Sequence, residues 1–153
     1  MKNLTLALSY ALCSVMFLQT PPARASSGAE VVDAAWSKAV VANDLNAVME
    51  CYDKDAVMWL PGAAEARGHE AIRAAYAGLF EANTVTDAAF SDTHYETNGN
   101  LSVGWGNFVL SLAPKSGGDP ITMSGRFTVI AKRNGKKWVY VADHASTGPA
   151  KND

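Results

Sequence analysis

The sequence predicts an α+β domain, in which helices gather on one side of an antiparallel sheet. Before Asn83, apolar residues recur mainly at spacings of three and four, the pattern of amphipathic helices. After it, four strand-like runs follow one another, separated by turn sequences such as Asn98-Gly99-Asn100 and Asn134-Gly135. The resulting order of helix, helix, strand, helix and four strands favours this class.

Three helices are expected in the first half of the chain. The first opens with the capping-box pattern Ser27-Gly-Ala-Glu30 and continues with an apolar stripe that includes Val32 and Trp36. The pair Asn43-Asp44 can cap a second, shorter helix. The third is expected from Gly68 to about Ala82, because its apolar residues again fall on one side.

Five strands are expected around and after these helices. The short apolar run from Ala56 to Leu60 ends at a Pro-Gly turn and predicts the first strand. The others are expected at Thr84 to Thr97, Leu101 to Ala113, Ile121 to Arg133 and Lys137 to Ser146.

Residues 1–25 predict a signal peptide. Lys2 gives a short positive region, an apolar run extends from Leu4 to Leu18, and Ala23 and Ala25 form an A-x-A cleavage pattern. The apolar run is shorter than the roughly 20 residues of a membrane span, which argues against the alternative of a retained anchor. We therefore expect an exported protein, periplasmic or secreted, with one domain at 26–147 and a flexible tail at 148–153.

Charge and cysteine content narrow the function classes. Residues 1–25 carry two of the 13 basic residues and none of the 15 acidic ones, so the remainder has a net charge of −4. No basic patch is present, which disfavours a nucleic-acid partner. Cys51 falls at an apolar helical position and is expected to be a packed core thiol rather than a nucleophile. His69, His94 and His144 lack metal-ligand spacing, so no metal is expected. The sequence has no glycine-rich phosphate loop at a helix start, and no cofactor is expected either.

Three groups of residues carry a family resemblance. Tyr52-Asp-Lys-Asp55-Ala-Val precedes the Pro-Gly turn, and Arg67-Gly-His-Glu-Ala-Ile72 opens the third expected helix. Gly125-Arg-Phe-Thr-Val is followed by Arg133-Asn-Gly-Lys-Lys-Trp138 and by Asp143-His-Ala-Ser146. With these residues in this order, the chain resembles the nuclear transport factor 2-like superfamily, most closely its SnoaL-like branch and the small bacterial domains of unknown function placed there.

The resemblance implies a cone-shaped fold. A strongly curved, mostly antiparallel sheet would wrap around three N-terminal helices and leave a pocket between them, commonly in a homodimer that pairs the outer sheet faces. Members include ketosteroid isomerases, polyketide cyclases, epoxide hydrolases and dehydratases, as well as binding and assembly modules. The resemblance therefore specifies the fold more than the activity.

Strand alternation selects the candidate polar site. Every second side chain of a strand points to one face, and the resemblance places Arg126, Thr128 and Asp143 toward the cone interior. We expect Arg126 and Asp143 to meet there, either as a structural salt bridge or as a substrate clamp or acid–base site, unless one or both face solvent. His144 is expected on the other face or at the rim, although a bulge near the strand end would exchange it with Asp143.

The expected pocket lining is mostly aromatic. Such a wall suits a small apolar or ring-bearing molecule, with a few polar groups that fix its orientation. Each aromatic residue is alternatively an ordinary core residue. The predicted ligand-binding residues are Trp36, Trp59, Tyr76, Phe80, Trp105, Phe108 and Thr128.

The ketosteroid isomerase mechanism is not expected. That reaction uses a carboxylate base after the first strand, together with a Tyr and a protonated Asp as oxyanion donors. By resemblance, these positions correspond to Leu60, Trp36 and Gly125 here. The isomerase residues are therefore missing, which favours binding over catalysis.

Three functions remain in order of preference. The first is an exported protein that binds a small, largely apolar molecule, with Arg126 anchoring any carboxylate or carbonyl oxygen. The second is a cofactor-free lyase, isomerase or cyclase with Asp143 or His144 as general base and Arg126 as oxyanion stabiliser. The third is a homodimeric scaffold without a ligand.

Overall fold

The computed structural model describes residues 28–148, so the predicted signal peptide lies outside the described residues. Three helices precede most of the sheet: α1 at Ala29–Val41, α2 at Leu45–Met49 and α3 at Gly68–Ala82. The strands are β1 at Tyr52–Trp59, β2 at Ala66–Arg67, β3 at Asn83–Asn98, β4 at Leu101–Pro114, β5 at Ile121–Asn134 and β6 at Lys137–Thr147. The predicted α+β class is confirmed.

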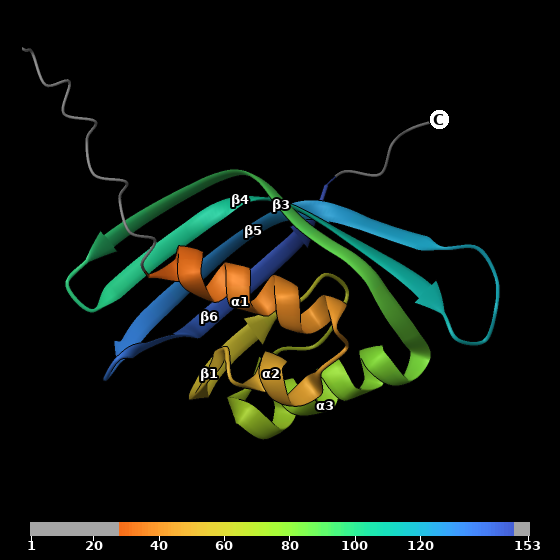
Figure 1. Ribbon diagram of the computed structural model, residues 1–153, viewed down its shortest axis with the longest axis horizontal. Helices are drawn as coiled ribbons and strands as arrows, with labels where there is room; N and C mark the ends of the chain where they lie inside the picture. The colour runs from red at the N-terminus through yellow and green to blue at the C-terminus, as the bar shows by residue number, and fades with distance from the viewer. Residues whose placement is uncertain (1–27, 149–153) are drawn as a thin grey trace, which may run out of the picture.

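All strands belong to one sheet in the order β2-β1-β6-β5-β4-β3. Among the described strands, β1 and β6 pair in parallel, and the other pairs are antiparallel. In Figure 1, α1 runs across the curved sheet, while α2 and α3 lie together beside β1. The sheet is larger than expected, because β1 begins at Tyr52 rather than near Ala56 and the two-residue β2 was not predicted.

The start of α1 differs from the expected capping box. Its N-cap is Gly28, which has a φ of 69° and makes no side-chain cap hydrogen bond. The Ala29 amide instead donates to Ser102 Oγ on β4 over 2.9 Å. A Cβ at residue 28 would lie 2.2 Å from that Oγ, so the close approach of the helix to the sheet requires glycine here. A tertiary contact has replaced the local cap.

The hydrophobic core lies between the helices and the concave face of the sheet. α1 and α3 contribute buried residues at the expected three- and four-residue spacings. On β5, Phe127, Val129 and Ala131 are buried, while Arg126 and Thr128 are exposed. The expected inner set of β5 was therefore wrong by one residue, because a strand orients so that its larger apolar set is buried.

A β-bulge in β6 changes which residues share the concave face. Ala131 pairs with Tyr140, and the preceding Ile130 pairs with Ala142, so Val141 has no partner in this ladder. An extra residue of this kind shifts the alternation of side chains. As a result, Tyr140 and Asp143 point to the same side of the sheet although they are an odd number of residues apart.

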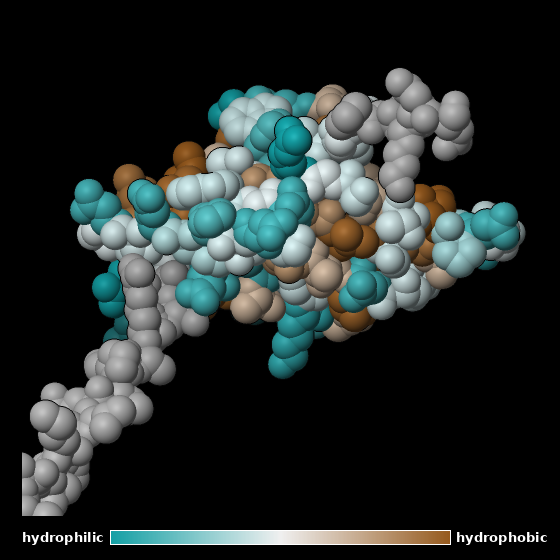
Figure 2. Space-filling view, turned by 90° about the horizontal axis from the view of Figure 1, so that it is seen from above, coloured by the Kyte–Doolittle hydropathy of each residue, from teal (hydrophilic) through white to brown (hydrophobic). Residues whose placement is uncertain are grey.

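Hydrophobic groups also reach the surface. Figure 2 shows brown, hydrophobic groups between the hydrophilic ones over the face that is visible there. The most exposed large hydrophobic side chains of the described part are Val31, Val41, Trp59, Leu101, Trp105, Val109, Ile121 and Ile130. No helix within residues 28–148 is long and apolar enough to cross a membrane.

Candidate functional site

A cavity of about 120 Å³ lies between the helices and the concave face of the sheet. An apolar cavity of roughly 150 Å³ is known to hold benzene, so this space is suited to a single ring. Its wall is almost entirely hydrophobic. It consists of Trp36, Leu60, Pro61, Tyr76, Leu79, Phe90, Phe108, Leu110, Met123, Phe127, Val129, Tyr140, Asp143 and Ala145.

Among the described residues of this wall, Asp143 is the one side chain that carries a formal charge at neutral pH. The bulge at Val141 turns it toward the cavity. Its Oδ2 accepts a hydrogen bond from the Tyr52 hydroxyl over 2.6 Å, and the structure shows no hydrogen bond from the described residues to Oδ1. Every fully buried side-chain nitrogen and oxygen atom of the described part has a partner, so Oδ1 retains some access to the space beside it.

Three further side chains extend the hydrogen bond at Oδ2 into a chain. The Tyr52 and Tyr76 hydroxyls lie 2.8 Å apart, and Trp36 Nε1 donates to the Tyr76 hydroxyl over 2.7 Å. An indole N–H can only donate and a carboxylate can only accept. When Asp143 is ionised, the chain therefore runs in one direction, from Trp36 through Tyr76 and Tyr52 to Asp143.

The apolar surroundings shift the protonation of this chain. Burial raises the pKa of Asp143 to about 6, and the nearby charge of Asp33 acts in the same direction. The hydrogen bond from Tyr52 and the charge of His144 partly oppose that rise. Burial also raises the pKa values of Tyr52 and Tyr76 well above the ordinary range for tyrosine. The tyrosines thus remain protonated donors, while Asp143 changes charge near neutrality.

A second buried carboxylate lies behind the cavity wall. Asp33 on α1 is 2% exposed and accepts hydrogen bonds from the Tyr95 hydroxyl, at 2.7 Å, and from the Tyr140 hydroxyl. Burial raises its pKa, and the two hydroxyl donors oppose that rise. The Tyr140 ring lines the cavity, but its hydroxyl is engaged with Asp33.

The predicted pocket residues divide into two groups. Trp36, Tyr76 and Phe108 line the cavity. Phe80 is buried and packs against Tyr76, with ring centroids 6.1 Å apart, outside the lining. Their roles in binding remain predictions.

The other predicted pocket residues lie on the outer face of the sheet. Trp59, Trp105 and Thr128 are exposed there, and the cross-strand register places them in one row with His94 and His144. Trp105 stacks on His94, and Trp59 contacts His144 edge-on. Thr128 was assigned to the interior because the alternation of its strand was read one residue out of phase. Trp59 and Trp105 were assigned there as aromatic residues, without a test of which face of the strand they occupy.

Arg126 does not meet Asp143. It pairs across the strands with Asn107 and Ser146, is exposed, and lines a shallow groove on the outer face. It forms no ion pair with any described residue. The expected salt bridge or clamp is therefore wrong in its geometry: Asp143 faces the cavity, whereas Arg126 and His144 face away from it. The catalytic roles predicted for these residues remain untested.

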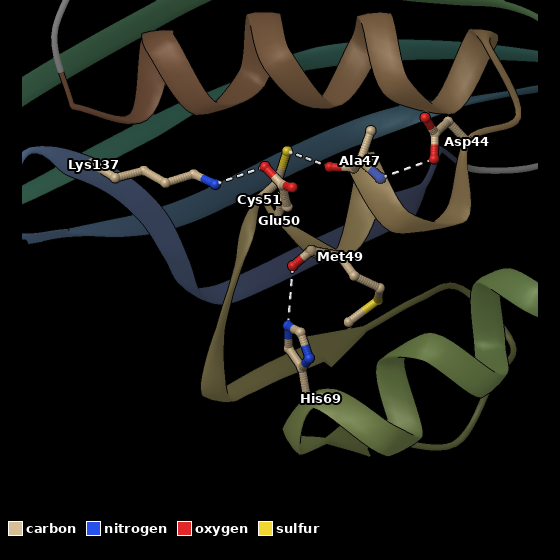
Figure 3. Close-up of polar contacts among 7 residues, drawn as sticks. All are labelled: Asp44, Ala47, Met49, Glu50, Cys51, His69 and Lys137. Atoms are coloured by element: carbon tan, nitrogen blue, oxygen red, sulfur yellow. Dashed lines mark hydrogen bonds and ion pairs between the residues drawn. The ribbon is translucent and has the colours of Figure 1, made fainter.

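Cys51 and His69 occupy structural positions between α1, α2 and α3 (Figure 3). Cys51 is buried, and burial raises its pKa to about 11, as expected for a packed thiol. The His69 ring lies 3.0 Å from the Met49 carbonyl oxygen and joins the start of α3 to the end of α2. Within residues 28–148, no three His, Cys, Asp or Glu side chains group in a way that could hold a metal ion.

Sequence reasoning missed three members of the polar site: Tyr52, Tyr140 and Asp33. Tyr52 stood in one of the motifs that carry the family resemblance, and Asp33 lies between the apolar pairs Val31-Val32 and Ala34-Ala35 of α1. An acidic residue one position after the expected stripe residue Val32 was a usable signal for a buried carboxylate. Tyr140 was assigned to the outer face, because the bulge after it has no sequence signature.

Comparison with known proteins agrees with this architecture. Residues 34–141 match the family model of the SnoaL-like domain, and the chain therefore belongs to that family. Among curated proteins, no sequence matches this one significantly.

Solved structures with the same fold include a nuclear transport factor 2-like superfamily protein from Salmonella enterica serovar Typhimurium. It is 15% identical, with a TM-score of 0.69 over 80% of this chain and 89% of that one. A ketosteroid isomerase-like protein from Erwinia carotovora is 20% identical, with a TM-score of 0.62 over 77% and 92% of the two chains. A candidate scytalone dehydratase from Novosphingobium aromaticivorans is 10% identical, with a TM-score of 0.72 over 78% and 80%. The nuclear transport factor 2-like fold is confirmed.

Proposed function

We propose that the protein binds a small, ring-bearing molecule in the cavity beside Asp143. The observation that carries the proposal is an apolar, largely aromatic cavity of single-ring size with one charged side chain in its wall. Small-molecule sites have this character, because apolar contacts supply most of the binding free energy and a few polar groups fix the orientation.

Native mass spectrometry of the protein purified gently from its own host tests this proposal. We expect a bound small molecule in the natural sequence. Ala145→Trp, which fills the cavity, is expected to abolish the bound mass. Ala142→Trp is the matched control, since Ala142 lies on the same strand and points to the opposite face. Equal occupancy in both variants would exclude the cavity as the site.

A second function is favoured by one further observation. Burial raises the pKa of Asp143 to about 6, which suits a general base that works near neutral pH. Cofactor-free proton transfer, as in an isomerase or lyase, is thus the alternative. The fold shared with a ketosteroid isomerase-like protein and a candidate scytalone dehydratase supports considering it. His144 and Arg126 are not placed to assist, because both lie on the outer face.

Turnover separates the two functions. A ligand recovered from the host is incubated with the natural protein and with Asp143→Asn, and its mass and isotope exchange in heavy water are followed. Deuterium incorporation that requires Asp143 would establish proton transfer. Unchanged ligand in both samples would leave binding as the function.

We also propose export and self-association. Residues 1–25 have the composition of a signal peptide, so intact mass measurement of the natural protein is expected to show a chain that begins at Ser26. The exposed Trp105, Val109 and Ile130 on the outer sheet face support a homodimer through that face.

A further inference from the structure

We propose that the cavity selects rings carrying a hydrogen-bond donor, such as a hydroxyl or ammonium group, and rejects carboxylates. The inference rests on the proposed binding function and names the chemical class of the ligand. The side-chain donors around the cavity already form hydrogen bonds within the protein, whereas Asp143 Oδ1 accepts none from the described residues.

The donors in the cavity wall are all engaged with protein acceptors. Trp36 Nε1 donates to the Tyr76 hydroxyl over 2.7 Å, and Tyr76 in turn donates toward Tyr52, 2.8 Å away. The Tyr140 hydroxyl donates to Asp33. Because a tyrosine hydroxyl carries one proton, none of these side chains has a second one to offer a ligand.

Only one of the two carboxylate oxygens of Asp143 accepts a hydrogen bond from the described residues. Tyr52 donates to Oδ2 over 2.6 Å, and no described residue donates to Oδ1. The side-chain wall thus offers a ligand one free acceptor and no free donor. A ligand that donates to Oδ1 completes the coordination of the carboxylate, whereas a ligand acceptor at that point would be left unpaired.

The charges around the cavity also favour ligands that donate a hydrogen bond over carboxylates. Within residues 28–148, no Lys, Arg or His side chain lines the cavity, and Arg126 lies on the outer face. A ligand carboxylate would be placed beside Asp143 and near Asp33 without a cation to compensate it. Like charges in apolar surroundings repel strongly and are poorly solvated there. Arg126 was first expected to anchor a ligand carboxylate. The charges around the cavity instead favour discrimination against carboxylates.

The hydrogen bond from Tyr52 also predicts how a substitution at residue 143 would exchange a hydrogen-bond acceptor for a donor in the cavity. Because its hydroxyl holds one side-chain oxygen of residue 143, Asp143→Asn is expected to keep the amide oxygen toward Tyr52. The amide nitrogen then takes the place of Oδ1 and faces the cavity. The variant would present a donor where the natural protein presents an acceptor, so it should prefer rings with an acceptor.

The test is calorimetric titration with single-ring probes at pH 8. Phenol and toluene differ in a hydroxyl and a methyl group of similar size; benzylamine supplies an ammonium donor, benzaldehyde an acceptor and benzoate an anion. We expect phenol or benzylamine to bind roughly tenfold or more tightly than toluene, and benzoate not to bind. The stronger of the two donors identifies hydroxyl or ammonium as the preferred group. In Asp143→Asn, preference should move toward benzaldehyde.

The outcomes distinguish this inference from the proposed function. Toluene binding as tight as that of both phenol and benzylamine, or tight binding of benzoate, would overturn the ligand class while leaving the cavity as a binding site. A variant Asp143→Asn with unchanged selectivity would overturn it as well. If no ring binds the natural protein, the proposed function fails together with the inference. Retained toluene binding by Asp143→Asn shows that the variant is folded.

Discussion

The Tyr52 hydroxyl donates a 2.6 Å hydrogen bond to Asp143 Oδ2, across 91 positions of sequence. This contact joins the start of β1 to the middle of β6, and these two strands lie side by side and pair in parallel. It fixes one oxygen of the carboxylate against the protein and leaves the other without a hydrogen bond from the described residues. The chemistry proposed for the site depends on that division.

Removing the Tyr52 hydroxyl should raise the pKa of Asp143 above about 6. The hydrogen bond stabilises the charged carboxylate and is one of the causes that lower its pKa. In Tyr52→Phe, phenol affinity is expected to fall at a higher pH than in the natural protein. Tyr95→Phe is the control, because its hydroxyl contacts Asp33 instead. A midpoint that moves equally in both variants would contradict a direct role for Tyr52.

Stability should decrease as Asp143 ionises. Its pKa rises from an ordinary 3.8 to about 6 on folding, so its contribution is fully present below pH 3.8 and is lost as pH rises through about 6. Asp143→Asn should therefore increase the free energy of unfolding at pH 7 by roughly 1–3 kcal/mol and have little effect at pH 4. Denaturant unfolding at both pH values measures this. A variant less stable at pH 7 would refute the assignment of a destabilised carboxylate.

Truncation of Asp33 should be costly. Asp33→Ala leaves the buried Tyr140 hydroxyl and the partly buried Tyr95 hydroxyl without their acceptor. An unsatisfied buried polar group costs about 1–3 kcal/mol, so the free energy of unfolding is expected to fall by roughly 2–5 kcal/mol. Glu30→Ala, an exposed change on the same helix, should shift it by about 0.5 kcal/mol or less. Similar unfolding midpoints for the two variants would contradict this.

A charge on the outer sheet face should weaken the proposed homodimer. Ile130 is 40% exposed in the middle of this face, and Ile130→Lys would place an ammonium group within an apolar contact. Sedimentation should show a dimer for the natural protein and a monomer for the variant. Val41→Lys alters a residue of similar exposure on α1, and it should leave the dimer intact. Dissociation by both variants, or by neither, would count against this face.

The sequence was sufficient to predict the elements of the fold. Periodic apolar residues and turn sequences placed α3 and the four long strands within a few residues of their observed bounds. These signals lie within the segment of sequence that forms each element, so each element can be predicted from its own residues. The two-residue β2 exists only because it pairs with β1, and a sequence segment that short carries no pattern of its own.

The facing of side chains was harder to predict, because it depends on register. On β5 the more apolar alternating set, which includes Phe127 and Val129, is the buried one, whereas the family resemblance had placed the set of Arg126 and Thr128 inside. On β6 the bulge at Val141 is visible only in the pairing with β5. Arg126 was assigned to the cavity because the wrong alternating set of β5 was placed inside. Tyr140 was left out of the cavity because the bulge that follows it in β6 was not predicted.

A nuclear magnetic resonance titration of the Asp143 carboxyl carbon, without and with phenol, would show whether this carboxylate lies in the cavity and contacts its ligand. A midpoint near pH 6 is expected in the free protein, because the group lies in an apolar wall. With phenol bound, the midpoint should move down, since a donor at Oδ1 stabilises the ionised form. A midpoint near 4 that phenol does not change would show that Asp143 is neither buried in the cavity nor in contact with its ligand.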